Sequence, residues 1–505
     1  MNSNYRILMM LVIVTLASLH LSAHDFEVDG IYYNVVSLES LTCEVSSASE
    51  GESQYSGIIN VPSEVTYNGR KLDVIGIGNS AFWGCEDLKE VVLPETISHI
   101  GSYAFRDCYN MERLNLPSTI SSIGESAFQN CRKLTSAIIP TSLTKLSSGL
   151  FSCCYELKEI VIPENVNSIG SDAFSYSGIE RCIIEDSTEP IILEGAFIQS
   201  IENIHSGSFS NAPIKYLYLG RNFIKIKPNY NNYHFSPFLN LNSIEEVVIG
   251  GLVTELPANT FAKVYRTENT NHGYSAYYEP LTNLTKMTFK ESSEVLKFIT
   301  GVWGNWYSHI SETSISDVDN VRVFILERNL NWEDNIGKLG GSSIFSGKYM
   351  ETTIEYAELT KKCTTVNENM FSRCHHLKNI VLGENISRIN NDSFEYTDSL
   401  FSIKIKATTP PSFNGNPGFS NNQYLNAKLY VPNESLGNYH TADVWKDFWN
   451  IEESDFSSST THIFVDEKKY PIGIYDINGR QYAKPIKGLN IMKYSDGSVE
   501  KILLK

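Results

Sequence analysis

One pattern returns every 23 residues between Val74 and Glu180, and no other feature of the sequence constrains the fold as strongly. Phenylalanine, cysteine and proline each recur at this step, together with an aliphatic residue that is mostly followed by glycine. A fixed period of this length is typical of a solenoid, because each repeat is one structural unit that stacks on the next. The repeated residues are Phe82, Phe105, Phe128, Phe151 and Phe174; Cys85, Cys108, Cys131 and Cys154; Pro94, Pro117, Pro140 and Pro163; and Ile77, Ile100, Ile123, Leu146 and Ile169.

Each repeat contains a short apolar run, for example Leu88, Val91 and Leu93, whose last positions alternate with outward-pointing residues. Alternation with a period of two predicts a short strand. The proline after each run lacks an amide donor and ends that strand. The A-F-x-x-C segment between strands is predicted to be a tight turn or a short helix with Phe and Cys turned inward. One repeat cannot cover its own two open faces, so stacking and capped ends must stabilise the array.

The repeat resembles the leucine-rich repeat, in the form found in BspA-like surface antigens of bacteria. That family repeats I-G-x-x-A-F-x-x-C-x-x-L-x-x-I-x-I-P. The resemblance implies a mainly β or α+β solenoid of 23-residue units. It also implies an adhesin-like role, because BspA-like proteins are described as adhesins toward host matrix proteins and other cells. In this chain the motif reads Ile100-Gly101-Ser102-Tyr103-Ala104-Phe105, followed by Cys108, Met111, Leu114, Leu116 and Pro117.

Outside the regular array the composition predicts a series of distinct segments. Arg6, the apolar residues 7–19 and Leu21-Ser22-Ala23 have the features of a secretory signal peptide. A β segment with the hairpin signal Asn68-Gly69 precedes the repeats. After Ile179 the repeats loosen and are separated by insertions rich in Asn and Tyr. The predicted boundaries are a signal peptide at 1–23, an N-terminal β cap at 24–73, a leucine-rich repeat array with insertions at 74–290, an irregular aromatic-rich segment at 291–350, resumed repeats with a helical cap at 351–451, and a small β tail at 462–505.

A short helix is predicted to seal the last coil within residues 432–451. The apolar residues there have helical spacing, and Trp445 and Trp449 are expected in the core of this cap rather than on a ligand platform. The spaced residues are Leu436, Tyr439, Ala442, Trp445 and Phe448.

The tail carries two hairpin signals, Asn478-Gly479 and Asp496-Gly497. Segments 474–480 and 487–491 resemble the C-terminal sorting domain used by type IX secretion. That resemblance implies delivery to the cell surface or the medium. A plain β tail that closes the protein is the alternative.

The formal net charge of −17 argues against a nucleic-acid partner, since proteins that bind phosphate backbones carry basic patches. No segment after the signal peptide is apolar enough to span a bilayer, so we expect a secreted or cell-surface chain, facing outward from the outer membrane. Most of the nine cysteines occupy the repeat position. One cysteine per turn in register favours buried free thiols, although stacked coils are close enough for disulfides.

No residue spacing predicts a catalytic, cofactor-binding or metal-binding site, so the chain is not expected to be an enzyme. The motifs H-E-x-x-H, G-x-S-x-G and G-x-G-x-x-G are absent. A phosphate loop ending at Gly347-Lys348 fails because Ser342 replaces its first glycine and Tyr349 its Ser or Thr. Residues 317–320 lack the glycine and distal glutamate of a calcium loop. His375-His376 is expected in a solvated turn.

The outward positions of successive strands are expected to form columns along the sheet. One column runs from Glu90 to Glu246 and the next from Val92 to Val248. With strands about 4.8 Å apart, the apolar and aromatic members would form one exposed patch roughly 20–25 Å long. Exposed stripes of this kind suit docking, whereas the alternative is that these are ordinary strand residues. The candidate partner-binding residues are Ile138, Val161, Ile183, Tyr216, Tyr218 and Val248.

Two functions fit these patterns, and neither needs a cofactor. The first is an exported, adhesin-like protein whose solenoid face binds a host or microbial protein, either in the extracellular matrix or on a cell surface. The alternative is a surface glycan-capture protein, in which Trp303, Trp306, Tyr307 and the insertion at 265–278 stack on sugars. These aromatic residues would otherwise pack a small core of their own segment.

Overall fold

The structure is a computed structural model, and the chain divides into two compact units, residues 1–179 and 180–505. Each unit is described by itself. The structure describes residues 24–47, 55–194, 197–200, 203–205, 207–225, 238, 241–257, 261–270, 273–281, 283–299, 321–331, 353–456, 471–475, 481–482, 488–494 and 499–504.

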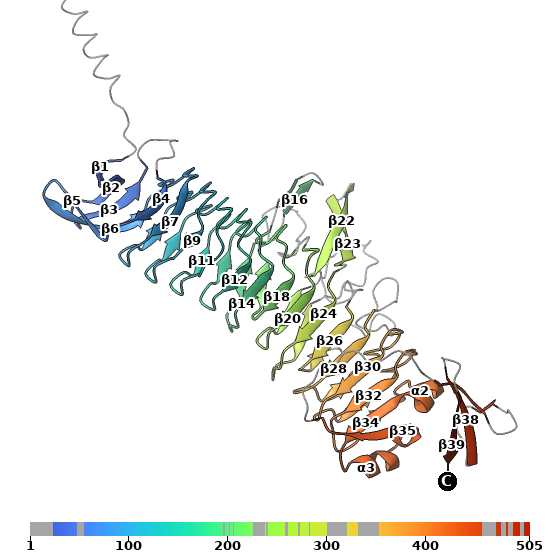
Figure 1. The fold of residues 1–505 in the computed structure, drawn as a ribbon. Coiled ribbons are helices and arrows are strands. Elements are labelled where there is room, and N and C mark those ends of the chain that lie inside the picture. The colour runs from blue at the N-terminus through green and yellow to red at the C-terminus, as the bar shows by residue number, and fades with distance from the viewer. Residues whose placement is uncertain are drawn as a thin grey trace, which may run out of the picture. The chain divides into compact units, whose positions relative to one another are not determined.

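The first unit is a stack of coils (Figure 1). A column of phenylalanine rings runs through its interior. From Phe82 to Phe174, successive rings lie nearly parallel, with centroids 4.9, 5.2, 5.4 and 5.9 Å apart. All five rings are fully buried. Identical side chains therefore form a continuous column through the interior, as the 23-residue period predicts.

The cysteine column lies beside the phenylalanine column. The Cys131 thiol donates to the Phe105 carbonyl oxygen at 3.2 Å, and Cys154 donates to Phe128 in the same way. A thiol at this position is small enough to be buried, and it also pairs with a carbonyl of the preceding coil. All nine cysteines of the chain are free thiols, and only Cys153 is more than slightly exposed. The A-F-x-x-C segments are turns, not short helices.

Two rows of short parallel strands flank these turns, after an N-terminal cap of mostly antiparallel strands. Asn68 and Gly69 both adopt positive φ in the predicted hairpin between β5 and β6. The cap strands are β1 (Phe26–Val28), β2 (Ile31–Ser37), β3 (Thr42–Ser46), β5 (Glu64–Tyr67) and β6 (Arg70–Ile77), which β8 (His99–Ile100) and β10 (Ser122–Ile123) extend. The other strands are β4 (Gly57–Asn60), β7 (Leu88–Val92), β9 (Arg113–Leu114), β11 (Lys145–Leu146), β12 (Glu159–Ile162) and β13 (Ser168–Ile169).

The strand predicted around residues 134–139 does not form. Its inward position holds Ala137, where the neighbouring coils have Leu114 and Ile160. Alanine buries little surface and has a low strand propensity, so this run gains less from joining the sheet. The sheet of β4, β7 and β9 ends before this coil.

The second unit is built on one parallel sheet whose strands lie side by side in chain order (Figure 1). Each pairing from β14 to β32 joins equivalent residues of successive coils without a register shift, for example Tyr216 with Glu246. The strands are β14 (Arg181–Ile184), β18 (Tyr216–Leu219), β20 (Glu246–Ile249), β24 (Lys286–Phe289), β26 (Val323–Leu326), β28 (Tyr356–Leu359), β30 (Asn379–Leu382), β32 (Ser402–Ile405), β34 (Lys428–Pro432) and β35 (Asn450–Ser454).

A second row of parallel strands in this unit completes the coils. Strands β25 to β27 lie within residues 291–350, which the sequence predicted to be irregular, so the coils continue through at least part of that segment. The second-row strands are β15 (Ile191–Leu193), β19 (Phe223–Lys225), β21 (Glu255–Pro257), β25 (Leu296–Ile299), β27 (Leu330–Asn331), β29 (Thr365–Val366), β31 (Arg388–Asn390) and β33 (Ser412–Asn414).

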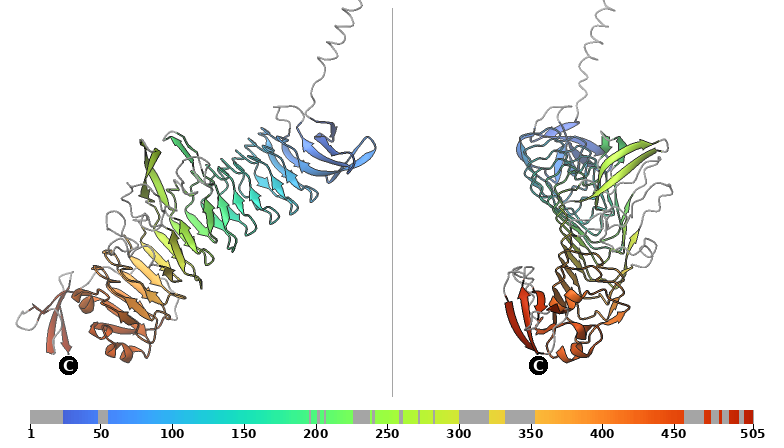
Figure 2. Two further views of the ribbon diagram at one scale, coloured as in Figure 1. Left: turned by 180° about the vertical axis from the view of Figure 1, so that it is seen from behind. Right: turned by 90° about the vertical axis from the view of Figure 1, so that its right-hand side faces the viewer.

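Two antiparallel hairpins interrupt the coils of this unit. β22 (Ala262–Thr270) with β23 (Gly273–Pro280) lies at the predicted insertion of 265–278, whereas the sequence did not predict the hairpin of β16 (Phe197–Ser200) with β17 (Asn203–His205). Both extend away from the strands of the parallel sheet (Figure 2).

The C-terminal cap differs from the single helix predicted at 432–451. Two short pieces form instead, α3 (Leu436–Thr441) and a 3₁₀ turn, η1 (Trp445–Asp447). Ala442 is extended and ends the helix, and Val444 adopts a φ of 68° before the 3₁₀ turn. Trp445 is fully buried, as predicted, and its Nε1 donates to the Pro411 carbonyl oxygen at 2.8 Å. Trp449 is only half-buried.

One further helix, α2 (Asn421–Asn426), begins with a capping box at Ser420 that the sequence analysis missed. In the tail, β36 (Pro471–Tyr475), β37 (Gln481–Tyr482), β38 (Gly488–Tyr494) and β39 (Val499–Leu504) form an antiparallel sheet.

Candidate functional site

The outward face of the second unit's sheet carries the aromatic part of the predicted patch. Tyr216 is paired in register with Arg181, whose guanidinium carbon lies 4.0 Å from the centroid of the Tyr216 ring. Glu246 follows Tyr216 in the same column and forms a 2.9 Å ion pair with Lys286. Tyr216 is half-buried, so part of its ring stays accessible beside a cation.

The neighbouring Tyr218 is fixed by hydrogen bonds. Its hydroxyl lies 2.9 and 2.8 Å from the two carboxylate oxygens of Asp186. Burial, followed by this carboxylate, raises the pKa of Tyr218, so the hydroxyl stays protonated and can donate. A Cβ at Gly250 would lie 2.9 Å from the Tyr218 oxygen and 2.7 Å from Asp186 Oδ1. Only glycine leaves room for this pair, which holds the ring in one orientation.

Ile183 and Val248 flank Tyr218 in the same column. Ile183 is half-buried, but the expectation that Val248 is exposed is wrong, since it is only 4% exposed. Val248 lies in register between Tyr218 and Thr288, at strand spacings of about 4.8 Å. A short branched side chain beside a larger tyrosine is shielded from solvent. The accessible patch of the second unit is therefore Ile183, Tyr216 and Tyr218, which we call the strand-face patch.

Ile138 and Val161 belong to the first unit, whereas the strand-face patch belongs to the second. Ile138 is 79% exposed, on the run that forms no strand, and Val161 is half-buried in β12. The proposed glycan platform of Trp303, Trp306 and Tyr307 lies outside the described residues.

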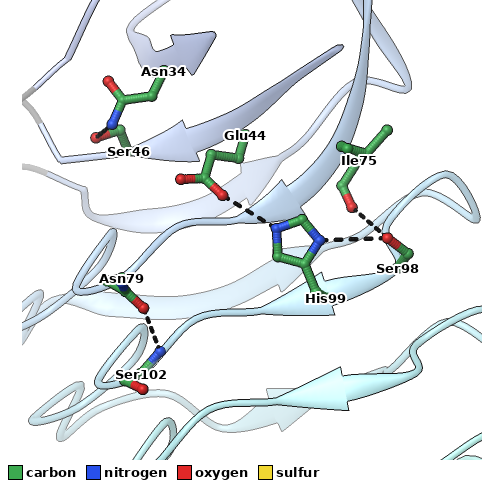
Figure 3. Close-up of polar contacts among 8 residues, drawn as sticks. All are labelled: Asn34, Glu44, Ser46, Ile75, Asn79, Ser98, His99 and Ser102. Atoms are coloured by element: carbon green, nitrogen blue, oxygen red, sulfur yellow. Dashed lines mark hydrogen bonds and ion pairs between the residues drawn. The ribbon is translucent and has the colours of Figure 1, made fainter. Parts of the chain in front are cut away.

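A serine, a histidine and a glutamate form a line of polar contacts in the N-terminal sheet (Figure 3). His99 Nε2 lies 3.1 Å from Glu44 Oε2, and His99 Nδ1 lies 3.4 Å from Ser98 Oγ. Glu44 and His99 are two strands apart, with Gly76 in register between them. Since Gly76 has no side chain, the carboxylate and the imidazole can meet above it.

This line lacks the hydrogen bond that nucleophilic catalysis needs. The Ser98 hydroxyl donates to the Ile75 carbonyl oxygen at 3.1 Å, so its proton is not directed to His99. The contacts instead tie the cap strand β3 to the strand β8 of the repeat array. Elsewhere, His375 and His376 are exposed, as predicted, and within the described segments no group of three His, Cys, Asp or Glu residues is placed to hold a metal ion.

The turns of the first unit present exposed aromatic side chains that the sequence analysis did not single out. Trp83, Tyr103, Tyr155 and Tyr176 are all exposed. The repeat indicates these positions, since each residue occupies a variable position within two residues of the repeated Phe or Cys. These aromatic residues lie in the turns, outside the strand columns from which the candidate residues were predicted.

The repeat pattern and the stacked coils agree with a comparison against family models. The sequence matches the BspA type leucine rich repeat region, in six copies, over residues 75–200, 191–301 and 342–466. These segments make up more than half of the chain. The chain belongs to the BspA-type leucine-rich repeat family. The predicted family and solenoid fold are thereby confirmed. No curated protein matches the sequence.

Several solved structures of leucine-rich repeat proteins are similar to this BspA-type chain. A leucine rich cell surface protein from Faecalibacterium prausnitzii is 17% identical, with 85% of this chain and 94% of that chain covered and a TM-score of 0.37. A leucine-rich repeat protein from Bacteroides ovatus is 19% identical, with 86% and 100% covered and a TM-score of 0.24. The pneumococcal vaccine antigen PcpA is 13% identical, with 86% and 99% covered and a TM-score of 0.31.

Membership of this family points to a role in protein interaction, which is the usual role of leucine-rich repeat proteins. None of the helices in the described part of the chain combines the length and apolar character needed to cross a membrane.

Proposed function

We propose that this protein is exported to the cell surface and binds a protein partner through its solenoid, in an adhesin-like role. The observation that carries the proposal is the strand-face patch, where Ile183, Tyr216 and Tyr218 lie together on regular parallel strands. Tyrosine and arginine are enriched among residues that dominate binding energy, and Arg181 stacks on Tyr216. Because Tyr218 is held by Asp186, binding would cost little side-chain entropy.

Export is the second part of the proposal. Residues 1–23 have the composition of a signal peptide, and the tail resembles a type IX sorting domain. The antiparallel sheet of β36 to β39 is compatible with a small domain that follows the solenoid. Removal of residues 462–505 should abolish surface exposure, measured by protease accessibility on intact cells. Unchanged exposure would contradict the sorting role and leave the binding proposal standing.

The binding proposal is tested with the double variant Tyr216→Ser, Tyr218→Ser. A pull-down from extracellular-matrix proteins with the mature chain should capture a protein that this variant binds about tenfold more weakly or worse, since two hot-spot residues are lost. The matched control is Tyr356→Ser, Tyr430→Ser, which changes the same two columns on distant coils. Equal binding by the two double variants would refute the strand-face patch as the contact surface.

The alternative function, glycan capture, has no support from Trp303, Trp306 and Tyr307, which lie outside the described residues. A different group of aromatic side chains favours a sugar ligand.

A further inference from the structure

The turns of the first unit have a regular backbone that displays side chains at fixed positions. In each turn the residue two before the phenylalanine and the residue two after it both have positive φ. This conformation repeats over five coils, whose phenylalanine rings are 4.9 to 5.9 Å apart. The residues before the ring are Ser80, Tyr103, Ser126, Gly149 and Asp172, and those after it are Gly84, Asp107, Asn130, Cys153 and Tyr176.

Aromatic and arginine side chains accumulate along these turns. Trp83 and Tyr155 are each 49% exposed, and Tyr176 is 53% exposed. Large aromatic side chains left open to water at this level are unusual for a structural position and mark interaction surfaces. We call the following set the turn ridge: Trp83, Tyr103, Arg106, Arg132, Tyr155 and Tyr176.

The N-terminal end of the turn ridge is held rigid by hydrogen bonds. Trp83 Nε1 donates to Asp107 Oδ2 at 3.0 Å, and Asn130 Nδ2 donates to Asp107 Oδ1 at 2.7 Å. Arg106 lies 5.8 Å from the Trp83 ring and 5.5 Å from the Tyr103 ring. The indole is therefore fixed before any ligand binds, which reduces the entropic cost of binding.

A second stacked group follows on the next coils. The guanidinium carbon of Arg132 lies 4.4 Å from the Tyr109 ring centroid and 6.0 Å from that of Tyr155. Both Arg132 and Tyr155 are exposed, so guanidinium donors and an open ring lie side by side.

We propose that the turn ridge binds a linear, uncharged polysaccharide. The apolar C–H faces of pyranose rings pack on aromatic rings, while carboxylate, amide and guanidinium groups pair with their hydroxyls. Asp107, Asn130 and Arg132 supply those groups directly beside Trp83 and Tyr155. A linear polymer also suits a ridge whose side chains recur on successive coils.

The charge of the turns selects against an acidic polymer. Over residues 79–88, 102–111, 125–134, 148–157 and 171–179, Asp and Glu outnumber Arg and Lys. A polyanion would be repelled, whereas the hydroxyls of a neutral sugar can donate hydrogen bonds to these carboxylates. The turn ridge shares no residue with the strand-face patch, and its proposed binding does not depend on that patch.

The test uses the mature full-length chain and the double variant Trp83→Ala, Tyr155→Ala. Neither residue has positive φ, so alanine fits the backbone at both positions. Affinity electrophoresis in gels containing mixed-linkage β-glucan, xylan, mannan or polygalacturonate measures binding. We expect retardation of the native chain by at least one neutral polymer and a dissociation constant at least about tenfold weaker for the variant, because two stacking rings are lost.

A second pair of variants guards against misfolding. Tyr176→Asn introduces a residue that tolerates positive φ. Tyr396→Asn makes the same change at the same turn position of a coil in the second unit. Tyr176→Asn should weaken neutral-polysaccharide binding and Tyr396→Asn should not. Retardation by polygalacturonate alone, no retardation by any polymer, or equal binding of all variants would overturn the proposal. Loss of a captured protein from the ridge variants, without any glycan binding, would assign the surface to a protein instead. Each of these outcomes leaves the strand-face test with Tyr216 and Tyr218 unaffected.

Discussion

Replacement of Phe128 tests the column of rings on which the first unit depends. The ring is fully buried between Phe105 and Phe151, with centroids 5.2 and 5.4 Å away. Phe128→Ala leaves a cavity in the middle of the column, and such changes cost about 3–5 kcal/mol. Phe128→Leu fills most of that space and loses the two ring contacts, at about 0.5–1.5 kcal/mol each. We therefore expect alanine to destabilise the unit by roughly 2 kcal/mol more than leucine.

The assay is hydrogen exchange of backbone amides in the intact chain, followed by mass spectrometry of peptides. A solenoid is stabilised by contacts between neighbouring repeats, so faster exchange should centre on the coils of Phe105, Phe128 and Phe151. Peptides from residues 353–456 serve as the internal control. A cost below about 1 kcal/mol for Phe128→Ala, or equally faster exchange in the control peptides, would refute the stacked column as the source of stability.

Two further predictions follow from other contacts. In Gly76→Ala the new Cβ would lie 2.1 Å from the His99 ring, so the variant should lose about 1–3 kcal/mol. Most of that loss should be absent when His99→Ala is the background, and additive losses in urea unfolding would contradict the proposed contact. Burial raises the pKa of the thiols of Cys43 and Cys363 from 9.0 to about 12. As the pH rises, these thiols lose their protons at a lower pH in the unfolded chain than in the folded chain. The folded chain therefore binds more protons above pH 9, and the free energy of unfolding must fall as the pH rises. The loss is about 1.4 kcal/mol per thiol at pH 10; a free energy of unfolding that is unchanged between pH 8 and pH 10, in reductant, would contradict it.

The inward side of the fold could be predicted from local sequence. Each repeat carries its own Phe, Cys and aliphatic positions, and the period alone brings equivalent residues together. The N-terminal hairpin at Asn68-Gly69 was predictable for a similar reason, because two adjacent residues determine the turn.

The predictions of secondary structure were wrong where a single residue departs from the repeat pattern. Ala137 weakens a strand that the pattern predicts, and the extended Ala442 ends a helix that the spacing predicts to continue. Loosened repeats also hid strands, since β26 and β27 lie in a segment with little visible pattern. For Ala137 the low strand propensity of alanine outweighed the repeat pattern. For β26 and β27, pairing with neighbouring coils formed strands that the loosened pattern does not show.

The sequence by itself determined the coil, its inward columns and the family, because burial at those positions follows from a periodicity present in every regular repeat. Only the tertiary structure decided which outward residues meet solvent. Val248 is shielded beside Tyr218, Ile138 stands open, and Trp83 is held by Asp107 from the next coil. Whether an outward residue is exposed depends on side chains of neighbouring coils. Insertions change how far apart those side chains lie in the sequence, so no local pattern specifies the exposure of outward residues.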